Sequence, residues 1–281
     1  MITVDNLNFS YTRKPFIESM NFAVKPGEIF GFLGPSGAGK STVQKILTGL
    51  IPTYKGSVVV NQTEAKKRNS DFYEHVGVDF EVPSLFEKLT GRENLRYFAS
   101  LYRHSLPIEP LLESVGLANE ADKKVMDYSK GMKSRLNFIK ALLHAPSLLF
   151  LDEPTSGLDP SNARVMKDLI LQQRKSGTTI VLTTHNMYDA TELCDRVAFI
   201  VDGTLCALDT PRNLIMSRGA ATITYSYREN AQECQGTSVL AETANDSCLQ
   251  RVLQENRLLS IHSSEPTLND IFSELTGRKL Q

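Results

Sequence analysis

The chain has 281 residues, 41% of them hydrophobic, which suits one large globular domain with a smaller one attached. Its 31 basic and 32 acidic residues leave a net charge of −1, which gives no electrostatic support for binding nucleic acid or an anionic membrane surface. No apolar run approaches the ~20 residues that span a bilayer, and the N-terminal residues lack the pattern of a secretory signal. The cysteines form no CxxC pair and are expected to be reduced and packed, as in a cytosolic protein.

The first 50 residues alternate apolar stretches with a glycine-rich loop. Alternating apolar residues over 2–9 and the stretch 22–24 predict two strands. Residues 29–33 predict a buried strand, a glycine-rich loop follows at 34–41, and helical periodicity continues to residue 50. The order strand, loop, helix predicts an α/β unit.

From Thr90 to about Ala145 the pattern is helical. Thr90 and Glu93 form a capping box, and Ser129 stands at the expected N-cap of a helix that runs to Pro146. A mainly helical segment therefore lies between two stretches in which strands and helices alternate.

The remainder of the chain returns to alternating strands and helices, with buried strands expected at 148–151 and 179–183. A domain boundary is expected near Met216–Gly219, so that the first domain covers residues 1–215 and an accessory domain covers 219–281. The accessory domain has roughly βαβα character, with its elements expected at 222–227, 248–254, 258–262 and 268–275.

The sequence GPSGAGKS at residues 34–41 matches the phosphate-binding pattern GxxxxGK[ST]. Its glycines allow backbone N–H groups to turn towards phosphates, and the following helix adds the positive end of its dipole. Lys40 can reach the β- and γ-phosphates, and the Ser41 hydroxyl can bind Mg²⁺. An ordinary glycine-rich turn is the alternative, but the Lys-Ser pair after a predicted strand favours a nucleoside triphosphate site.

Two carboxylates follow the predicted strand 148–151. Ligands bind at the C-terminal edge of parallel sheets, so Asp152 suits holding Mg²⁺, through water in most such sites, and Glu153 suits polarising the attacking water. His185 follows a neighbouring buried strand, where its imidazole can contact the γ-phosphate and that water. Each of these features alone would also fit a strand that ends in a solvated turn. Their occurrence together with the glycine loop favours a hydrolytic site.

Taken together, these residues resemble the ATP-binding cassette of ABC transporters over roughly residues 1–215. Tyr11 stands where that family stacks an aromatic ring on adenine, a tyrosine at a strand end being the alternative. The sequence SGLD at 156–159 resembles the family's loop that links two sites across a dimer.

The sequence YSKGM at 128–132 resembles the family's signature motif, which in ABC dimers contacts the γ-phosphate bound by the other subunit. Ser129 and Gly131 occupy the matching positions, and the helix after Ser129 would aim its N-terminus at that phosphate. Ser129 lies 23 residues before Asp152, a spacing similar to that of the family.

The sequence departs from the family pattern at two places. The family usually has a glutamine in the loop that joins its lobes, whereas no Gln occurs here between Gln62 and Gln172 and Glu81 stands at that position. Glu81 is expected either to bind Mg²⁺ or to face solvent or a basic residue of a membrane partner. The signature also has Lys130 and Met132 where the family usually has a second glycine and a glutamine.

One branch of the ABC family exports drugs, antibiotics, polysaccharides and ions. Its members have similar signature motifs and a C-terminal end similar to residues 266–278. The resemblance therefore implies an α/β P-loop NTPase core of the ABC ATPase type, with an antiparallel β lobe, a helical lobe of about residues 84–145 and a small α+β C-terminal appendage. It also implies a peripheral ATPase at the cytoplasmic face of the cell membrane that powers export through a separate integral membrane permease, without a nucleic-acid partner. Leu85, Phe86 and Leu89 are expected either to meet that permease or to pack within the helical lobe.

The resemblance implies a dimer, formed with a second copy or with a paralogous ATPase subunit, that holds ATP and Mg²⁺ at its interface. Glu153 and His185 are the expected catalytic residues, and Ser41, Asp152 and Glu81 the expected metal ligands. The residues expected to contact ATP are Tyr11, Gly34, Pro35, Ser36, Gly37, Ala38, Gly39, Lys40, Ser41, Thr42, Ser129, Gly131 and Asp159.

Other classes of protein explain less of the sequence. ABC ATPases that act on ribosomes resemble two cassettes joined in one chain, and those that act on DNA carry long coiled coils. Neither feature is present in this sequence. A GTPase is disfavoured because no NKxD motif occurs, and a small-molecule kinase leaves the signature and SGLD segments unexplained. A binding module without turnover would not need Glu153 and His185.

Overall fold

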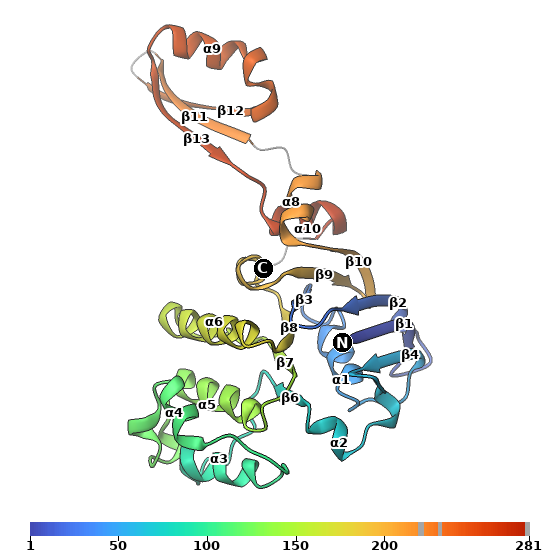
Figure 1. Ribbon diagram of the computed structural model, residues 1–281. Coiled ribbons are helices and arrows are strands. Elements are labelled where there is room, and N and C mark those ends of the chain that lie inside the picture. Colours follow the sequence, from blue (N-terminus) through green and yellow to red (C-terminus); the bar gives the residue numbers. More distant parts are fainter. Residues whose placement is uncertain (219–221, 230–231, 279–281) are drawn as a thin grey trace. The chain divides into compact units, whose positions relative to one another are not determined.

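The computed structural model describes residues 1–218, 222–229 and 232–278, which are shown as a ribbon in Figure 1. They divide into two compact units, Met1–Asp209 and Thr210–Gln281. None of the helices within the described ranges combines the length and the apolar character that a membrane span requires.

The first unit ends at Asp209, before the boundary at residue 215 that the sequence suggested. Helix α8 (Pro211–Arg218) belongs to the second unit because it packs against helix α10 (Leu268–Thr276). Gly219, the first residue of the expected accessory domain, lies outside the described residues.

A six-stranded sheet in the order β10-β9-β3-β8-β7-β6 organises the first unit. Its strands are β3 (Ile29–Leu33), β6 (Val76–Asp79), β7 (Leu148–Asp152), β8 (Thr179–Thr184), β9 (Arg196–Val201) and β10 (Thr204–Asp209). All neighbours pair in parallel except β9 and β10, which form an antiparallel hairpin. Strands β3 and β8 are buried along their whole length, which explains their continuous apolar or β-branched sequences.

The register brings the carboxyl ends of β3, β8, β7 and β6 to one edge of this sheet. The glycine loop follows β3, His185 follows β8, and Glu81 lies two residues beyond β6. Asp152 ends β7, and Glu153 follows it. The topology therefore delivers the separate motifs of the sequence to neighbouring positions.

An antiparallel sheet in the order β2-β1-β4-β5 forms the β lobe. Its strands are β1 (Ile2–Phe9), β2 (Ile17–Val24), β4 (Lys55–Val60) and β5 (Thr63–Glu64). The buried rings of Phe22, Phe30 and Phe32 join this lobe to strand β3, with ring centroids 5.1 to 5.8 Å apart. Each such ring contributes roughly 1.5–3 kcal/mol of burial free energy. Helix α1 (Lys40–Leu47) shares the same core.

Helices α3 (Gly91–Ala99), α4 (Ile108–Ser114) and α5 (Lys130–Leu142) form the helical lobe, coloured green in Figure 1. Thr90 and Glu93 make the predicted capping box. Helix α5 ends at Leu142, short of the predicted Pro146. The first unit also contains the α-helices α2 (Ser70–Tyr73), α6 (Pro160–Lys175) and α7 (Met187–Leu193).

The second unit contains a three-stranded antiparallel sheet in the order β12-β11-β13, together with helix α9. These elements are β11 (Thr222–Glu229), β12 (Gln232–Val239), α9 (Ser247–Gln254) and β13 (Leu258–Ser264). The predicted βαβα order missed β12, because its sequence QECQGTSV is polar and mostly exposed or half-buried. A small core of Ile223, Tyr225 and Leu249 joins the sheet to α9.

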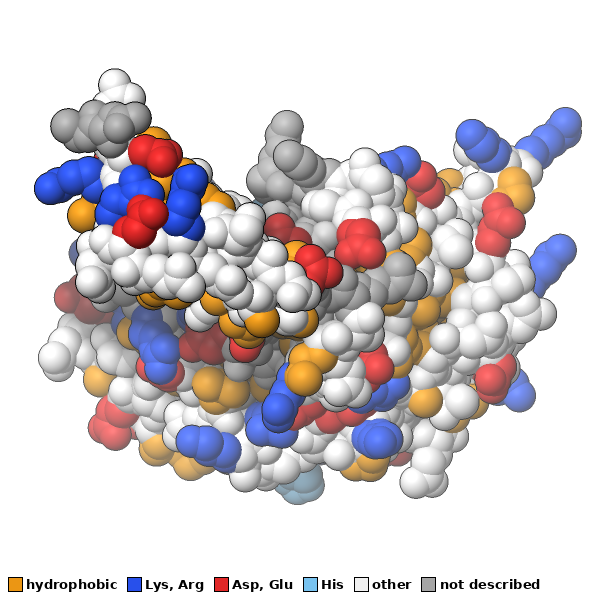
Figure 2. Space-filling model, turned by 90° about the horizontal axis from the view of Figure 1, so that it is seen from above, with side chains coloured by type: hydrophobic (Ala, Val, Ile, Leu, Met, Phe, Trp, Pro, Cys, Tyr) orange, Lys and Arg blue, Asp and Glu red, His pale blue; other side chains and the backbone are white. Residues whose placement is uncertain are grey.

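Basic and acidic side chains are interspersed on the face shown in Figure 2, in keeping with the net charge of −1. The four cysteines are free thiols, but the expectation that all are packed is wrong. Cys194 is buried, and burial raises the pKa of its thiol, whereas Cys206 is exposed.

Candidate active site

A cavity of about 260 Å³ lies at the carboxyl edge of the six-stranded sheet. Its lining residues are Phe16, Ser36, Gly37, Ala38, Gly39, Lys40, Ser41, Thr42, Glu81, Glu153 and His185. The structure thus brings the glycine loop together with the expected water-polarising carboxylate, the expected histidine and Glu81. Phe16 is the one lining residue that the sequence did not indicate.

The backbone of the loop favours glycine, for different reasons at Gly34 and Gly39. A Cβ atom on Gly34 would lie 2.1 Å from the carbonyl oxygen of Ile200, so no side chain fits there. Gly39 has φ 111°, a conformation that residues with a side chain rarely adopt, and it immediately precedes helix α1. The first N–H groups of a helix have no acceptors within it, so the N-terminus of α1 offers donors to an anion.

Lys40 is a nearly desolvated cation inside this loop. Its Nζ donates hydrogen bonds to the carbonyl oxygens of Gly34 at 2.7 Å and Pro35 at 3.2 Å, and it lies 3.8 Å from Glu153 Oε1. Burial lowers the pKa of Lys40, and the nearby carboxylates of Glu153, Asp152 and Glu81 oppose that shift. A phosphate is the kind of anion that would compensate this buried charge.

Asp152 and Ser41 are close enough to share one small cation. The Ser41 hydroxyl donates to Asp152 Oδ1 at 3.3 Å, and the Thr183 hydroxyl donates to the same oxygen. Carboxylate and hydroxyl oxygens are hard ligands of the kind that Mg²⁺ selects beside nucleotide phosphates, so the donor set fits this ion. Thr183 carries no motif in the sequence, and its contact with Asp152 depends on the β7–β8 register.

Glu153 and His185 form a pair at the rim of the cavity. Glu153 Oε1 lies 3.0 Å from His185 Nδ1, and the Glu153 side chain is 11% exposed whereas that of His185 is 45% exposed. Glu153 has φ 51°, a left-handed conformation that costs a residue with a side chain roughly 1–2 kcal/mol. Its N–H donates to the Thr183 carbonyl at 3.0 Å, which helps to fix this turn.

Tyr11 lies beside the glycine loop and remains exposed. Its hydroxyl is 2.9 Å from Thr42 Oγ1, in the helix that follows the loop. Its ring packs edge-on against Phe9, with centroids 4.7 Å apart, and is tilted towards Phe16 at 5.5 Å. These contacts fix the ring at the edge of the site while leaving much of its surface open.

Ser129, Gly131 and Asp159 are not among the described residues that line this cavity. The side chain of Ser129 caps helix α5 by accepting the N–H of Met132 at 3.2 Å. A Cβ on Gly131 would lie 2.7 Å from the side chain of Asn162, whose backbone N–H donates to Asp159 at 3.0 Å. The two hydrogen bonds from Asn162 lower the pKa of Asp159. The chain therefore places the YSKGM and SGLD segments against each other.

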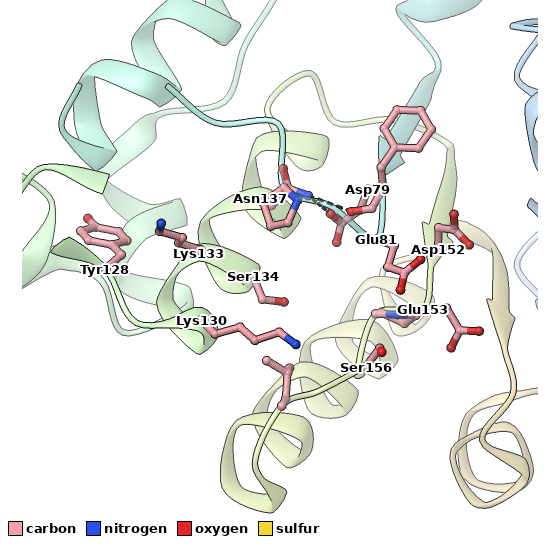
Figure 3. A pocket seen from close by; sticks show the side chains of 14 residues that line it. Asp79, Glu81, Tyr128, Lys130, Lys133, Ser134, Asn137, Asp152, Glu153 and Ser156 are labelled. Atoms are coloured by element: carbon pink, nitrogen blue, oxygen red, sulfur yellow. Dashed lines mark hydrogen bonds between the residues drawn. The ribbon is translucent and has the colours of Figure 1, made fainter. Parts of the chain in front are cut away.

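A second cavity of about 250 Å³ adjoins the first, since Glu81 and Glu153 line both (Figure 3). Asp79 lies on its wall, is buried, and accepts a hydrogen bond from Asn137. Burial raises the pKa of Asp79 to about 7, although Lys140 and Asn137 act in the opposite direction. Neither Asp79 nor Asn137 was predicted as a site residue, because both stand between apolar neighbours in the sequence.

The glycine loop, the carboxylates of neighbouring strands and the inserted helical lobe define a class of protein, the P-loop ATPases with a two-lobed cassette. The sequence model of the ABC transporter family matches residues 17–156. A fluoroquinolones export ATP-binding protein of Mycobacterium tuberculosis is 47% identical over 285 residues, covering 100% of this chain and 94% of that protein. The linearmycin resistance ATP-binding protein of Bacillus subtilis is 30% identical over 310 residues, with 100% of both chains covered. The chain therefore belongs to the ABC transporter family, as one of its ATP-hydrolysing subunits.

Solved structures agree with this assignment. An ATP-binding subunit of an ABC transporter aligns with a TM-score of 0.70 at 30% identity, covering 77% of this chain and 92% of its own. CbiO1 of Clostridium perfringens, part of an ABC transporter complex, aligns with a TM-score of 0.69 at 25% identity, covering 77% of this chain and 90% of its own. The predicted family and fold class are thus confirmed.

Proposed function

We propose that this subunit binds ATP and Mg²⁺ on the glycine loop and hydrolyses the ATP with Glu153 as the water-polarising residue. The observation that carries the proposal is the placement of Glu153, 3.0 Å from His185 and 3.8 Å from Lys40, at the rim of the glycine-loop cavity. A carboxylate in this position can accept a proton from a water that attacks the γ-phosphate.

Phosphate binding would use the loop backbone, the N-terminus of α1 and Lys40. The Lys40 ammonium would exchange its bonds to the Gly34 and Pro35 carbonyls for bonds to phosphate oxygens. Ser41 and Asp152 would hold Mg²⁺, with Glu81 as a third candidate. When bound, the ion neutralises phosphate charge and orients the triphosphate.

Glu153 would act with His185 as a pair. The left-handed backbone at Glu153 and its N–H bond to Thr183 aim the carboxylate into the cavity. A proton on His185 Nδ1 would hold Glu153 Oε1, leaving the other carboxylate oxygen to take the proton of the attacking water. His185 is thus proposed to orient the carboxylate and to contact the γ-phosphate.

Two cassettes are proposed to complete each other's sites. The N-terminus of α5, with Ser129 and Gly131, offers backbone N–H groups, and Asp159 stands next to it through Asn162. Because none of the three residues lines the cavity of its own chain within the described ranges, a second copy or a paralogous subunit is the proposed recipient. Closing and opening of this dimer would couple ATP turnover to transport.

The membrane partner is proposed to dock on the helical lobe. Phe86, Tyr97 and Leu101 are large hydrophobic residues that remain exposed there, and Val82 is exposed in the segment that precedes the lobe. Phe86 packs edge-on against Tyr97, with ring centroids 4.9 Å apart. Leu85 and Leu89 are half-buried, so of the three expected contact residues Phe86 is the most available. A peripheral position at the cytoplasmic face of the membrane follows from this docking.

The experiment is co-expression with a candidate permease, followed by membrane sedimentation and ATPase assay. Fluoroquinolones are the first substrates to test, since the mycobacterial relative is named for their export. We expect the subunit to sediment with membranes only when the permease is present, and replacement of Phe86 by Ser to weaken this association. Sedimentation that is independent of the permease would contradict the proposed partner.

Tyr11→Ala is expected to weaken ATP binding by about 1–3 kcal/mol, the range measured for a base stacked on an aromatic side chain. Tyr11→Phe should have a mild effect, because it keeps the ring and loses only the hydroxyl contact with Thr42. Equilibrium binding of ATP and GTP measures both variants, and stacking predicts similar losses for the two bases. Unchanged affinity in Tyr11→Ala would exclude the stacking role.

Glu81→Gln is expected to raise the Mg²⁺ concentration needed for half-maximal ATPase activity, because a carboxylate binds this cation better than an amide does. The same variant should bind ATP more tightly in EDTA, since a negative charge that faces the cavity is removed. Titration of Mg²⁺ against ATPase rate compares the variant with the wild type. Superimposable curves would leave Glu81 as a solvent-facing or partner-facing residue.

A further inference from the structure

The segment of residues 80–84 connects strand β6 to the helical lobe and carries Glu81. Glu81 lines both cavities and contributes electrostatically to the environment of Lys40, although its side chain is largely exposed. An exposed carboxylate on a connecting segment is held in place only if its backbone is fixed. The contacts of this backbone therefore decide where Glu81 points.

Two side chains of helix α5 hold the segment at both of its ends. Asn137 Nδ2 donates to Asp79 Oδ1, as Figure 3 shows, and to the Phe80 carbonyl at 3.4 Å. Lys140 Nζ donates to Asn137 Oδ1 at 2.6 Å and to the Ser84 carbonyl at 3.2 Å. One continuous chain of hydrogen bonds thus runs from the end of β6 through α5 to the end of the segment.

Two polar side chains of this network, those of Asp79 and Asn137, are buried. Asp79 is 6% exposed at the end of an otherwise apolar strand, and Asn137 is 1% exposed on the buried side of α5. Apolar residues of similar size would stabilise such an interface at least as well, because burying a carboxylate and an amide costs desolvation free energy. What hydrogen bonds add is a defined geometry between the elements that they join.

We propose that Asp79, Asn137 and Lys140 form a clamp that positions Glu81 for the reaction. This inference rests on the proposed function, in which Glu81 is a candidate ligand of Mg²⁺ at the ATP site. Helix α5 begins next to its cap Ser129, eight residues or about 12 Å before Asn137. The clamp therefore also ties the position of Glu81 to the helix whose N-terminus is proposed to serve the second cassette.

The first test separates positioning from stability. Asn137→Ala leaves the buried Asp79 carboxylate without its donor, so both thermal stability and kcat should fall. The paired replacement Asp79→Val with Asn137→Ala removes both polar groups and should recover the melting temperature. Its kcat should remain ~10–100-fold low, the loss typical when the partners that orient a metal ligand are removed. Recovery of kcat together with the melting temperature would overturn the clamp as a positioning device.

The second test is a double-mutant cycle with Glu81→Ala. If the clamp acts through Glu81, the paired replacement should lower kcat in the wild-type background and have no further effect in the Glu81→Ala background. Asn94→Ala is the matched control, because Asn94 is equally buried in the same lobe but bonds the carbonyls of Phe86 and Thr90. Its effect on kcat should be the same in both backgrounds. Equal losses from the paired replacement in both backgrounds would refute the inference.

The outcomes also separate the inference from the proposed function. If the Glu81→Ala variant hydrolyses ATP at the wild-type rate, the inference is overturned but the proposed ATPase function stands. If the wild-type protein has no ATPase activity, the proposed function itself is refuted. Hydrogen exchange of residues 80–84 needs no turnover, and we expect it to accelerate in the paired replacement while the rest of helix α5 stays protected. Unchanged exchange in this segment would overturn the clamp whatever the ATPase activity is.

Discussion

Glu153→Gln is expected to bind ATP and to hydrolyse it ~10²–10⁴-fold more slowly than the wild type, the usual contribution of a general base. The amide matches the carboxylate in shape, so it can occupy the same left-handed position and still face His185. It cannot accept the proton of the attacking water. The loss should therefore appear in kcat, with little change in the affinity for ATP.

A second consequence of Glu153→Gln concerns the oligomeric state. Because ATP would persist between two cassettes, the variant should accumulate as a dimer in ATP and Mg²⁺, measured by size exclusion with light scattering. Glu192→Gln is a matched control, since Glu192 pairs with Arg164 and Lys167 on the surface of α6 and α7. That control should behave like the wild type. A Glu153→Gln variant with wild-type kcat would show that another group polarises the water.

The parts of this site that depend on local sequence were predictable. The glycine loop lies between β3 and α1 as its pattern requires, because the strand, the turn and the helix N-terminus are encoded in adjacent residues. Asp152 and Glu153 were placed at a strand end by the apolar run before them. The meeting of these segments followed from the general rule that ligands bind at the carboxyl edge of a parallel sheet.

Features that depend on contacts between distant residues were not predictable in this way. The Asp79–Asn137 hydrogen bond joins residues 58 positions apart, and each stands in a segment whose pattern indicates only burial. The left-handed backbone at Glu153 depends on tertiary contacts such as its bond to Thr183. Strand β12 lacks an apolar periodicity, so its pairing with β11 decides its structure.

Lys40→Met is expected to weaken ATP binding by about 1.5–3 kcal/mol, or roughly 10–100-fold, the range for a hydrogen bond to a charged group. Methionine keeps the length of the aliphatic stem, so it fills the same space without the ammonium group. Titration calorimetry with a non-hydrolysable ATP analogue measures the affinity apart from turnover. Lys45→Met is the control in the same helix, because Lys45 is exposed on the opposite side of α1 from its buried residues.

The thermal stability of Lys40→Met without nucleotide distinguishes a lost phosphate contact from a damaged fold. The Lys40 side chain is only 7% exposed, and burial lowers its pKa, so the protein bears a desolvation cost to keep the charge there. Replacing it by an apolar side chain of similar length removes this desolvation cost but also leaves the Gly34 and Pro35 carbonyls and Glu153 without their cation. Because these two effects oppose each other, the melting temperature of the nucleotide-free protein should change little. Stabilisation by added ATP should shrink at the same time, because ligand-induced stability follows affinity. A lower melting temperature together with wild-type ATP affinity would show that Lys40 serves the fold rather than the phosphates.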